Sequence, residues 1–481
     1  MSKDKMMERL QVKDDKIVNT SGKPVWLRGT CIGGWMNMEN FINGYPGDES
    51  GIRWAMAQML GPAKAEFFFD RLLDYFLNED DIRFIKECGA TVVRLPVNYR
   101  HFEHDSAPFQ YVEKGFARLD RVIQWCAKHS LYAIIDLHAA QGWQNPDWHC
   151  DNPSRQTLFW NQKQFQDRFV ALWEEFAHRY AGNPTLAGYN ILNEPVTNTP
   201  FGRFSNSYTP NWEIINQVYR RVVTAIRKID PTTIIFLEGD YFSSLFSGLD
   251  SPFDKNMVYS SHNYTNCGFG PGSYPGTYEG VYWDYNKQKE SFLNHEGIRY
   301  AHTHHVPLWV GEFGSVYNGP PEEKKYRLQA MDDQLAIFGQ YQVQWTTWTY
   351  KDVGVMGWVT LPPESEYLHT IQPALKAKYD LYSDFWMRWL SLPPVAQDVE
   401  KLADKIADTV TGYKVDRSAN RRYLMQHTLS GYVGNFLQPY YAQCFNGMKE
   451  KEIDRVLQSF SLKNCTPNIE LLNILKKHLS E

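Results

Sequence analysis

Eight short apolar runs alternate along the chain with stretches of helical periodicity, and this alternation limits the possible folds more than any other feature. The runs are Val25–Gly33, Thr91–Val97, Leu131–His138, Leu186–Asn193, Thr233–Gly239, Met257–His262, Val306–Phe313 and Val343–Thr349. Strands separated by helical segments are typical of βα units and a parallel sheet. Eight such units predict a closed (β/α)8 TIM barrel of the α/β class. A dinucleotide-binding sheet is disfavoured because no Gly-x-Gly-x-x-Gly follows the first run.

The segments around these runs predict the rest of the barrel. Helices are expected at Leu77–Cys88, Ala117–His129, Phe165–Tyr180 and Trp212–Asp230, with Asn78 or Asp80 as the cap of the first helix. Residues Leu10–Lys23 resemble a polar hairpin that would close the barrel bottom. The long insertion Gly34–Tyr75 follows the first strand, so it is expected on the top face, where barrel loops carry function.

Beyond Pro362 the pattern becomes helical. Val399, Leu402, Ile406 and Val410 recur at helical spacing. Thr466-Pro467 resembles an N-cap followed by proline at the first helical position, with Ile469, Leu472 and Leu475 on one apolar face. We therefore predict a catalytic barrel with its N-terminal hairpin over residues 1–411 and a helical extension over 412–481. The extension is expected to pack on the barrel wall, in preference to forming a lid or a dimer contact.

Composition excludes several classes of protein. Hydrophobic residues make up 43% and charged residues 22%, values typical of a globular protein, and a net charge of −5 disfavours nucleic acid as a partner. The seven cysteines are scattered without a CxxC spacing, which favours reduced thiols. Neither an apolar signal segment nor an apolar run long enough to span a membrane is present. We therefore expect a cytoplasmic protein without a membrane span, and its oligomeric state is left open.

Polar residues stand where the predicted strands end, which is where barrel enzymes place reactive groups. They are Arg94, His138, Asn193, Glu194, His262, Tyr264, Glu312 and Trp348. Two carboxylates at the ends of different strands are what glycoside hydrolysis requires, one protonated and one ionised. A carboxyl separation of roughly 5–5.5 Å gives retention of configuration, and a separation of roughly 6.5–9.5 Å gives inversion. Arg94 is a permanent cation that would keep one carboxylate ionised.

Other residues are weaker candidates for the site. Glu238 and Asp240 end the fifth strand and are second choices as carboxylates, whereas Asp136 is interpreted as structural. Substrate contacts are also considered for Trp35, Trp143, Asn145, Trp148 and Asp240, since a flat ring can pack on a sugar face. The His302-Thr303-His304-His305 cluster precedes the seventh strand and is therefore expected at the barrel bottom, away from the chemistry.

The ordered set of motifs resembles glycoside hydrolase family 5, the cellulase-like retaining enzymes, from about Leu10 to Lys351. Arg94 lies in VVRLPV, His138 in IIDLH, Asn193 and Glu194 in NILNEP, His262 and Tyr264 in SHNY, Glu312 in WVGEFG, and Trp348 in WTTWTYKD. The stretch LNEDDIRFIKECGATVVRLPVNY is also similar to the branch that contains exo-acting β-glucanases.

The resemblance implies a role for each matched residue. Glu194 would be the acid/base, and Glu312 the nucleophile that Arg94 and Tyr264 orient. Asn193 would bind the sugar 2-hydroxyl, His138 and His262 would line the sugar subsite beside the scissile bond, and Trp348 would be its stacking floor. The family needs neither a metal nor another cofactor.

The preferred hypothesis is a retaining β-glycosidase acting by double displacement on β-linked gluco- or manno-configured oligosaccharides or glycosides. Exo action is favoured because the long first loop and the loop Gln141–Ser154 are expected to block one end of the cleft. An endo-β-glucanase or mannanase is the first alternative. A catalytically inactive sugar-binding protein is disfavoured because both glutamates are present, and a metal-dependent hydrolase or an aldolase because the strand ends carry too few histidines or lysines. The sugar, the linkage and the aglycone are left open.

Overall fold

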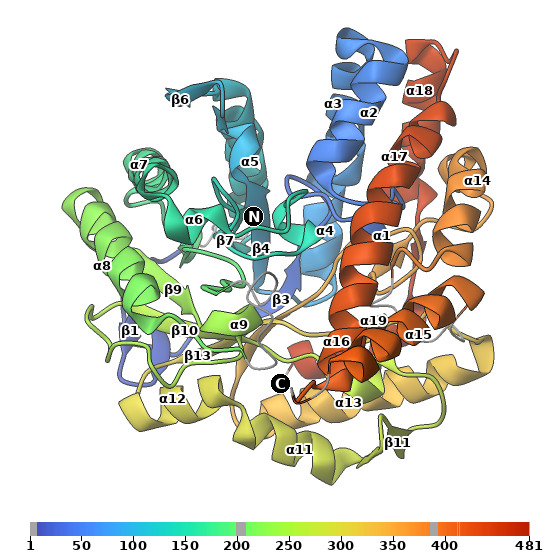
Figure 1. The fold of residues 1–481 in the computed structure, drawn as a ribbon. Coiled ribbons are helices and arrows are strands. Elements are labelled where there is room, and N and C mark those ends of the chain that lie inside the picture. The colour runs from blue at the N-terminus through green and yellow to red at the C-terminus, as the bar shows by residue number, and fades with distance from the viewer. Residues whose placement is uncertain (1–6, 199–207, 385–392, 411, 413, 481) are drawn as a thin grey trace.

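A closed barrel of eight parallel strands forms the centre of the molecule (Figure 1). The computed structural model describes residues 7–198, 208–384, 393–410, 412 and 414–480. In chain order the barrel strands are β3 (Arg28–Cys31), β4 (Val92–Asn98), β7 (Tyr132–Ala139), β8 (Leu186–Asn190), β9 (Ile234–Glu238), β10 (Met257–His262), β13 (Leu308–Glu312) and β14 (Gln344–Thr347). Pairing of β14 with β3 closes the barrel. Each predicted run overlaps one strand, so the predicted (β/α)8 fold is confirmed.

Amphipathic helices cover the outside of the barrel. They are α4 (Glu79–Glu87), α5 (Glu113–Lys128), α7 (Lys163–Tyr180), α8 (Trp212–Ile229), α11 (Tyr285–Asn294), α12 (Glu296–His304) and α13 (Lys324–Gln340). The four helices predicted from the sequence match α4, α5, α7 and α8. Asn78 caps α4 because its side chain accepts a hydrogen bond from the backbone N–H of Asp80 at 2.8 Å. The fifth unit departs from the regular pattern, since β9 and β10 are joined by a segment with only the four-residue α9 (Asp240–Ser243).

An antiparallel hairpin closes the bottom of the barrel, as predicted. It consists of β1 (Leu10–Lys13) and β2 (Lys16–Asn19). Leu10 and Ile17 pack into an apolar cluster with residues from the starts of the barrel strands, among them Val92, Ile234 and Val258. The shorter elements of the remaining loops are η1 (Tyr99–His101), β5 (Glu103–His104), β6 (Ala107–Tyr111), η2 (Trp148–Cys150), α6 (Leu158–Asn161), α10 (Asn266–Phe269), β11 (Gly276–Tyr278), β12 (Val281–Trp283) and η3 (Pro321–Glu323).

The insertion after the first strand folds into helices that stand beside the C-terminal helices (Figure 1). It contains α1 (Asn40–Asn43), α2 (Glu49–Leu60) and α3 (Pro62–Phe76), and α17 (Gly434–Gln443) packs on α2. Gln438 of α17 lies so close to α2 that a Cβ on Gly51 would stand 2.1 Å from its Oε1. Its Nε2 also donates to the carbonyl of Asp48 at 2.9 Å. The absence of a side chain at Gly51 therefore allows the two helices to approach this closely.

The C-terminal region is helical, and its last helix, α19 (Ile469–Leu479), packs on α13 of the barrel. The elements of this region are α14 (Glu366–Asp380), α15 (Pro394–Thr409), α16 (Arg417–Met425), the π-helix η4 (Gln426–Val433), α17, α18 (Glu450–Leu457), η5 (Gln458–Phe460), η6 (Leu462–Asn464) and α19. Arg28 of β3 donates to the carbonyl of His478 in α19 at 2.9 Å, and Lys477 pairs with Asp332 of α13. The predicted division between two units falls at residue 411, which lies outside the described residues, and it stays a prediction.

The predicted start of the last helix is wrong. Thr466–Pro467 forms the short strand β17, which pairs with β16 (Val359–Thr360), and β16 pairs in turn with β15 (Lys351–Asp352). The N-cap of α19 is Asn468, whose backbone N–H donates to the carbonyl of Trp358 at 2.8 Å. Backbone pairing with β16 therefore keeps Thr466 and Pro467 extended, and a proline is tolerated at such an edge. Ile469 is 60% exposed and does not share the buried face of Leu472 and Leu475.

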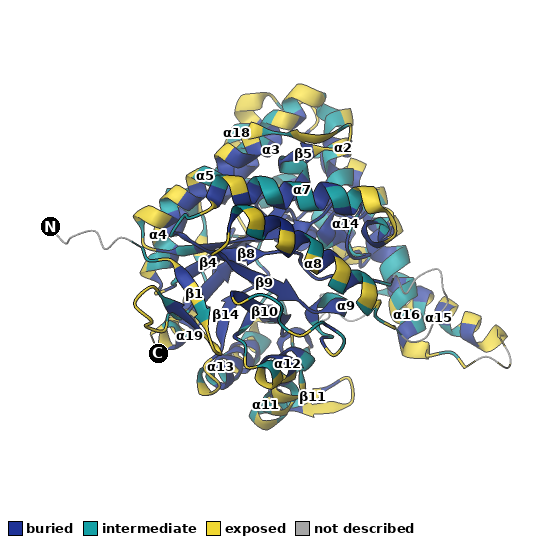
Figure 2. Ribbon diagram, turned by 90° about the vertical axis from the view of Figure 1, so that its left-hand side faces the viewer, coloured by how far each residue is buried: buried dark blue, intermediate teal, exposed yellow. Residues whose placement is uncertain are grey.

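Helix α15 forms over the predicted segment, but its buried stripe differs from the apolar pattern in the sequence. Leu402, Ile406 and Val410 are between 45% and 50% exposed. The buried positions of the helix are Ala396, Val399, Ala403 and Ala407. Three of these four are alanines, which allow close packing against α16. Figure 2 shows both helices projecting from the body of the molecule with many exposed residues.

Two further predictions concern cysteines and membranes. All seven cysteines are free thiols, which agrees with the prediction from their spacing. Among the described residues, no helix combines the length and the apolar character needed to cross a bilayer.

A buried lysine joins the barrel to the C-terminal helices. The ammonium group of Lys351 donates to Asp81 of α4 at 2.7 Å, to the carbonyl of Phe76 at 2.8 Å and to the carbonyl of Phe460 at 2.7 Å. Both members of the ion pair are fully buried. Removal of one charge would leave the other unpaired away from water, which is more costly than the net value of the pair.

We therefore expect Lys351→Met to lower the free energy of unfolding by about 3–5 kcal/mol. Equilibrium unfolding in urea measures this loss. The matched control is Lys477→Met, which breaks a solvent-exposed pair with Asp332 and should cost less than about 1 kcal/mol. Equal effects of the two variants would contradict a structural role for the buried pair.

Candidate active site

A cavity of about 400 Å³ opens over the carboxyl ends of the barrel strands. Five of the predicted site residues line it directly, and they are His138, Glu194, Tyr264, Glu312 and Trp348. The other three, Arg94, Asn193 and His262, lie beneath this lining and bond to its members. The structure therefore brings together all eight residues that the motifs predicted.

The guanidinium of Arg94 connects the ends of four strands. It is fully buried on β4 and donates to Glu312 at 2.6 Å and to Asn193 at 2.7 Å. It also lies 3.2 Å from Glu238 and 3.1 Å from Asp136. Burial opposes the charged form of Arg94, but Asp136 and Glu312 outweigh burial and raise its pKa well above the ordinary value. One permanent cation therefore pairs with three buried carboxylates.

Glu312 is held at both carboxylate oxygens. Arg94 binds Oε1, and the hydroxyl of Tyr264 donates to Oε2 at 2.9 Å. Tyr264 itself is a cavity residue and is 37% exposed, so the group that orients Glu312 also faces the opening. The side chain of Glu312 is therefore fixed while its carboxylate remains at the cavity surface.

Glu194 occupies an uncommon backbone conformation. Its φ of 44° lies in the left-handed region, which non-glycine residues seldom adopt. The surrounding groups stabilise this conformation from both sides of the residue. Its backbone N–H donates to Glu238 at 2.9 Å, and its carbonyl accepts from the amide of Asn145 at 3.0 Å. This kind of local strain is found at functional sites when neighbouring contacts over-determine the geometry.

Two histidines stabilise the charged form of the Glu194 carboxylate. His262 Nδ1 lies 2.7 Å from Oε1, and His149 Nε2 lies 3.0 Å from Oε2. Burial would raise the pKa of Glu194, but hydrogen bonds from His149 and His262 overcome burial and hold it well below the ordinary value. Glu238, Glu312 and Glu194 in turn overcome burial and raise the pKa of His262 well above its ordinary value. The group therefore holds a proton on His262 next to an ionised Glu194.

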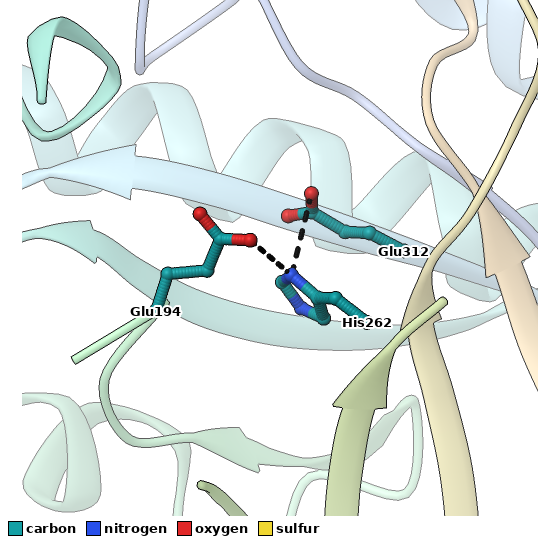
Figure 3. Close-up of side chains that lie close together, drawn as sticks. All are labelled: Glu194, His262 and Glu312. Carbon is teal, nitrogen blue, oxygen red and sulfur yellow. Dashed lines mark hydrogen bonds and ion pairs between the residues drawn. The ribbon is translucent and has the colours of Figure 1, made fainter. Parts of the chain in front are cut away.

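His262 stands between the two glutamates, as Figure 3 shows. Its Nδ1 is 3.5 Å from Oε2 of Glu312, and one ligand-type atom from each of the three side chains lies within 4.8 Å of the others. The register of β10 against β13 shifts between Ser261 and His262, and such an irregularity re-aims a side chain next to a site.

The opposite side of the cavity is built around a stacked pair of rings. His138 and Trp348 are nearly parallel, with centroids 5.2 Å apart and an interplanar angle of 8°. Asp136 lies 2.8 Å from Nδ1 of His138, and Glu39 lies 3.4 Å from Nε2. Burial alone would lower the pKa of His138, but these two carboxylates raise it to about 9. Trp348 is thereby held flat against a cationic ring while it lines the cavity.

The weaker sequence candidates behave differently from one another. Trp148 lines the cavity. Trp35 is 1% exposed and donates to the carbonyl of Leu73, so it is a core residue. Trp143 does not line the cavity either, and Asn145 acts on the carbonyl of Glu194. Asp240 is buried and accepts hydrogen bonds from Thr197, Tyr208 and Tyr241, so it organises the β9 loop beside the cavity.

Several cavity residues were not identified from the sequence. Glu39 and Phe41 come from the first loop, His149 from the loop after β7, and Tyr241 and Phe242 from α9. A lone glutamate or histidine in a long loop carries no positional signal. For His149, the sequence offered one indication of a place in the site: it follows Trp148 in a loop that was expected at the top of the barrel.

The trio Glu194, His262 and Glu312 has the spacing of possible metal ligands. Its donor set already has partners, because Arg94 and Tyr264 bind both oxygens of Glu312 and two histidines bind both oxygens of Glu194. A cation there would stand beside the Arg94 guanidinium. The His302–His305 cluster lies as expected at the bottom, where His302 and His305 line a separate cavity with Ile17.

A family model for cellulases of glycosyl hydrolase family 5 matches residues 68–354, which is more than half of the chain. The chain belongs to glycoside hydrolase family 5. It is therefore a glycosidase of the cellulase-like type, as the motifs at the strand ends predicted.

Curated members of the family are similar over much of the length. A protein of Phanerodontia chrysosporium named β-xylosidase is 36% identical, with 98% of this chain and 99% of that protein covered. Endoglucanase C of Acetivibrio thermocellus is 28% identical, with 60% of this chain and 87% of that protein covered. A crystal structure of an endogalactoceramidase matches with a TM-score of 0.51 at 17% identity, covering 72% of this chain and 75% of that one. This last likeness supports the fold alone.

The structure predicts that His149 influences the ionisation of Glu194 directly. In a His149→Ala variant the pKa of Glu194 should rise toward its ordinary value, because one of two hydrogen bonds to the charged form is lost. Carbon-13 resonances of labelled glutamate carboxyls follow this titration, and the Glu194→Gln variant assigns the signal. His302→Ala, which changes a histidine at the barrel bottom, should leave the Glu194 titration in place. An unchanged pKa in His149→Ala would exclude the proposed coupling.

Proposed function

We propose that this family 5 glycosidase is a retaining β-glycosidase that removes a terminal sugar from short β-linked oligosaccharides or glycosides of gluco or manno configuration. The supporting observation is the close approach of two carboxylates at the cavity surface. Oxygens of Glu194 and Glu312 lie within 4.8 Å of each other, which fits the short carboxyl separation of retaining enzymes rather than the wider gap that admits water.

Glu312 is the proposed nucleophile. Arg94 and Tyr264 fix its two oxygens by hydrogen bonds, which orients the carboxylate for attack. Attack of Glu312 on the anomeric carbon forms a covalent glycosyl–enzyme bond while the bond to the leaving oxygen breaks. The carboxylate charge is lost in this step, so the ion pair with Arg94 is weakened until water regenerates Glu312.

Glu194 is the proposed acid/base, with His262 as its proton partner. The leaving oxygen must receive a proton, and the 2.7 Å contact between His262 and Glu194 holds one there. We propose that entry of the substrate brings this proton onto Glu194, which passes it to the leaving oxygen. In the second step Glu194 accepts a proton from the attacking water. This attack inverts the anomeric carbon a second time, so the original configuration is restored.

The sugar that undergoes cleavage is proposed to sit against Trp348 and His138. The amide of Asn193 is oriented by Arg94, and its Nδ2 lies 3.2 Å from Nε2 of His138. This amide is proposed to bind the 2-hydroxyl, a contact that strengthens in the transition state. The buried carboxylate of Glu39 lies at the same end of the cavity and would accept hydrogen bonds from further hydroxyls. Burial raises the pKa of Glu39, although the neighbouring His138 opposes this effect.

Exo action is supported by the elements around the cavity. Glu39 and Phe41 of the first loop and Trp148 of the β7 loop form its lining, and the rings of Phe41 and Trp148 meet edge to face at 5.9 Å. A wall of this kind leaves room for a chain end and obstructs a polymer that passes through. The match to the relative named β-xylosidase covers 98% of this chain, so xylosides should be included among the substrates that are measured.

Removal of the nucleophile provides the first test. Glu312→Ala should lower kcat on aryl β-glycosides by more than ~10³-fold, because the covalent step is lost. Initial rates on aryl glucosides, mannosides and xylosides measure the effect and rank the sugars. Glu470→Gln alters an exposed carboxylate on α19 and serves as the control. Substantial residual activity of Glu312→Ala would refute the assignment.

Removal of the acid/base should produce a different signature. In Glu194→Ala, hydrolysis of substrates with poor leaving groups should fall much more than that of activated aryl glycosides, because only the poor leaving groups need a proton. Added azide should restore turnover by attacking the glycosyl–enzyme, which gives a β-glycosyl azide. A product of α configuration, read by proton resonance, would contradict double displacement.

The mode of cleavage is tested with β-linked oligosaccharides of increasing length. Exo action should release one sugar at a time from a single end of every oligosaccharide, because only a chain end would fit against Glu39, Phe41 and Trp148. Chromatography of the early products measures this distribution. Random internal cleavage would instead support the endo alternative that relatives such as Endoglucanase C exemplify by name.

A further inference from the structure

We infer that the C-terminal helices α16 and η4 form the leaving-group subsite of this enzyme and select a second sugar as the leaving group. This inference rests on the proposed function and deepens it. Arg422, Tyr423 and Gln426 line the same cavity as the two glutamates, although they lie more than a hundred residues after the second of them. The sequence pattern had assigned this region to packing on the barrel wall.

The position of Glu194 identifies the leaving-group side of the cavity. An acid/base must contact the oxygen between the two parts of the substrate, so the departing part lies on its side. A series of contacts leads from Glu194 toward the C-terminal helices. His149 is 3.0 Å from the carboxylate, the ring of Phe242 is 6.1 Å from that of His149, and Tyr241 is 5.5 Å from Phe242. Glu39 and Trp348 belong to the side of His138 instead.

A left-handed turn presents the two aromatic residues of this series. Tyr241, Phe242 and Ser243 all have φ between 54° and 58°, which is a costly conformation for residues other than glycine. The turn is held by the contact of the Tyr241 N–H with Asp240 at 2.8 Å and of the Ser243 hydroxyl with the carbonyl of Ser260 at 2.7 Å. The neighbouring structure thus maintains a strained backbone that places two rings on the cavity surface.

The C-terminal helices complete this surface from the other side. Tyr423 and Tyr241 line the same cavity, and burial together with the neighbouring Tyr241 raises the pKa of Tyr423. Gln426 donates to Asp147 of the β7 loop, which connects η4 to the opposite rim of the cavity. The exposed guanidinium of Arg422 stands beside the ring of Tyr423, with 6.0 Å from Cζ to the ring centroid.

The chemistry of this surface fits a pyranose ring. The aromatic rings of Tyr241, Phe242 and Tyr423 offer flat apolar faces, and Arg422 and Gln426 add hydrogen-bonding groups at the rim. A sugar presents C–H groups on its face and hydroxyls on its edge, so it uses both kinds of contact. An aliphatic or aryl leaving group would use the rings and leave Arg422 and Gln426 without a role.

The test compares two substrates that share one glycone. The first is a β-linked disaccharide, and the second is the corresponding β-glycosyl fluoride, whose small leaving group does not reach the C-terminal helices. In Arg422→Ala and in Tyr423→Ala, kcat/KM for the disaccharide should fall about tenfold or more, because each change removes a hydrogen-bonding or stacking partner. The kcat/KM for the fluoride should change less than about threefold. The measured quantity is therefore the ratio of kcat/KM for the disaccharide to kcat/KM for the fluoride.

A matched control is available on the same helix. Arg421 is adjacent to Arg422 but pairs with Asp404 of α15 and is not a cavity residue. Arg421→Ala should therefore keep the wild-type ratio of the two kcat/KM values. Circular dichroism of each variant establishes that the helices are folded, and Tyr423→Phe, which retains the ring, should recover most of the disaccharide activity lost in Tyr423→Ala.

The possible results separate the two proposals. If the wild-type enzyme hydrolyses neither substrate, the proposed function fails. If the variants lose activity on both substrates equally, or on neither, the leaving-group subsite is overturned while the proposed function stands. If Tyr423→Ala lowers the ratio of disaccharide to fluoride kcat/KM and Arg422→Ala leaves it unchanged, the subsite offers only an apolar surface and the inference of a second sugar is overturned.

Discussion

The buried guanidinium of Arg94 is the interaction on which the site depends. It lies within β4 and reaches Glu312 of β13, Glu238 of β9 and Asn193 after β8, so it joins four parts of the barrel through one charge. Without it, several carboxylates would be buried together and would have to take up protons. With it, Glu312 is held in a fixed orientation, and Glu238 accepts a hydrogen bond from the backbone of Glu194.

The same arrangement controls the second glutamate indirectly. Glu238 holds the N–H of Glu194 in its left-handed conformation and also lies 3.4 Å from His262, which bonds to the Glu194 carboxylate. The strained backbone of Glu194 and the proton on His262 therefore both depend on Glu238, a carboxylate that does not line the cavity. This explains why a residue first considered as a competing catalyst belongs to the support of the site instead.

Two long segments give the cavity its shape. The first loop contributes Glu39 and Phe41 on one side, and the C-terminal helices contribute Arg422 and Tyr423 on the other. The segments are far apart in the chain but pack on each other through α2 and α17, with Gln438 fitted against Gly51. The packing of α17 on α2 and of α18 on α3 therefore joins the two regions that contribute residues to the cavity.

The sequence alone determined the barrel and the eight residues at its strand ends. Parallel strands with alternating helices can close in few ways, and a residue at the end of such a strand must face the mouth, so Arg94 and Glu312 were predictable from position. Only the tertiary structure decided which loop residues join them. Glu39, His149 and Tyr423 lie in segments without a fixed period, and their distances from Glu194 depend on packing between regions remote in the chain. Local periodicity specifies an element and one of its faces, but long-range contacts specify which elements meet, as the exposed Leu402 and the early strand at Thr466 also demonstrate.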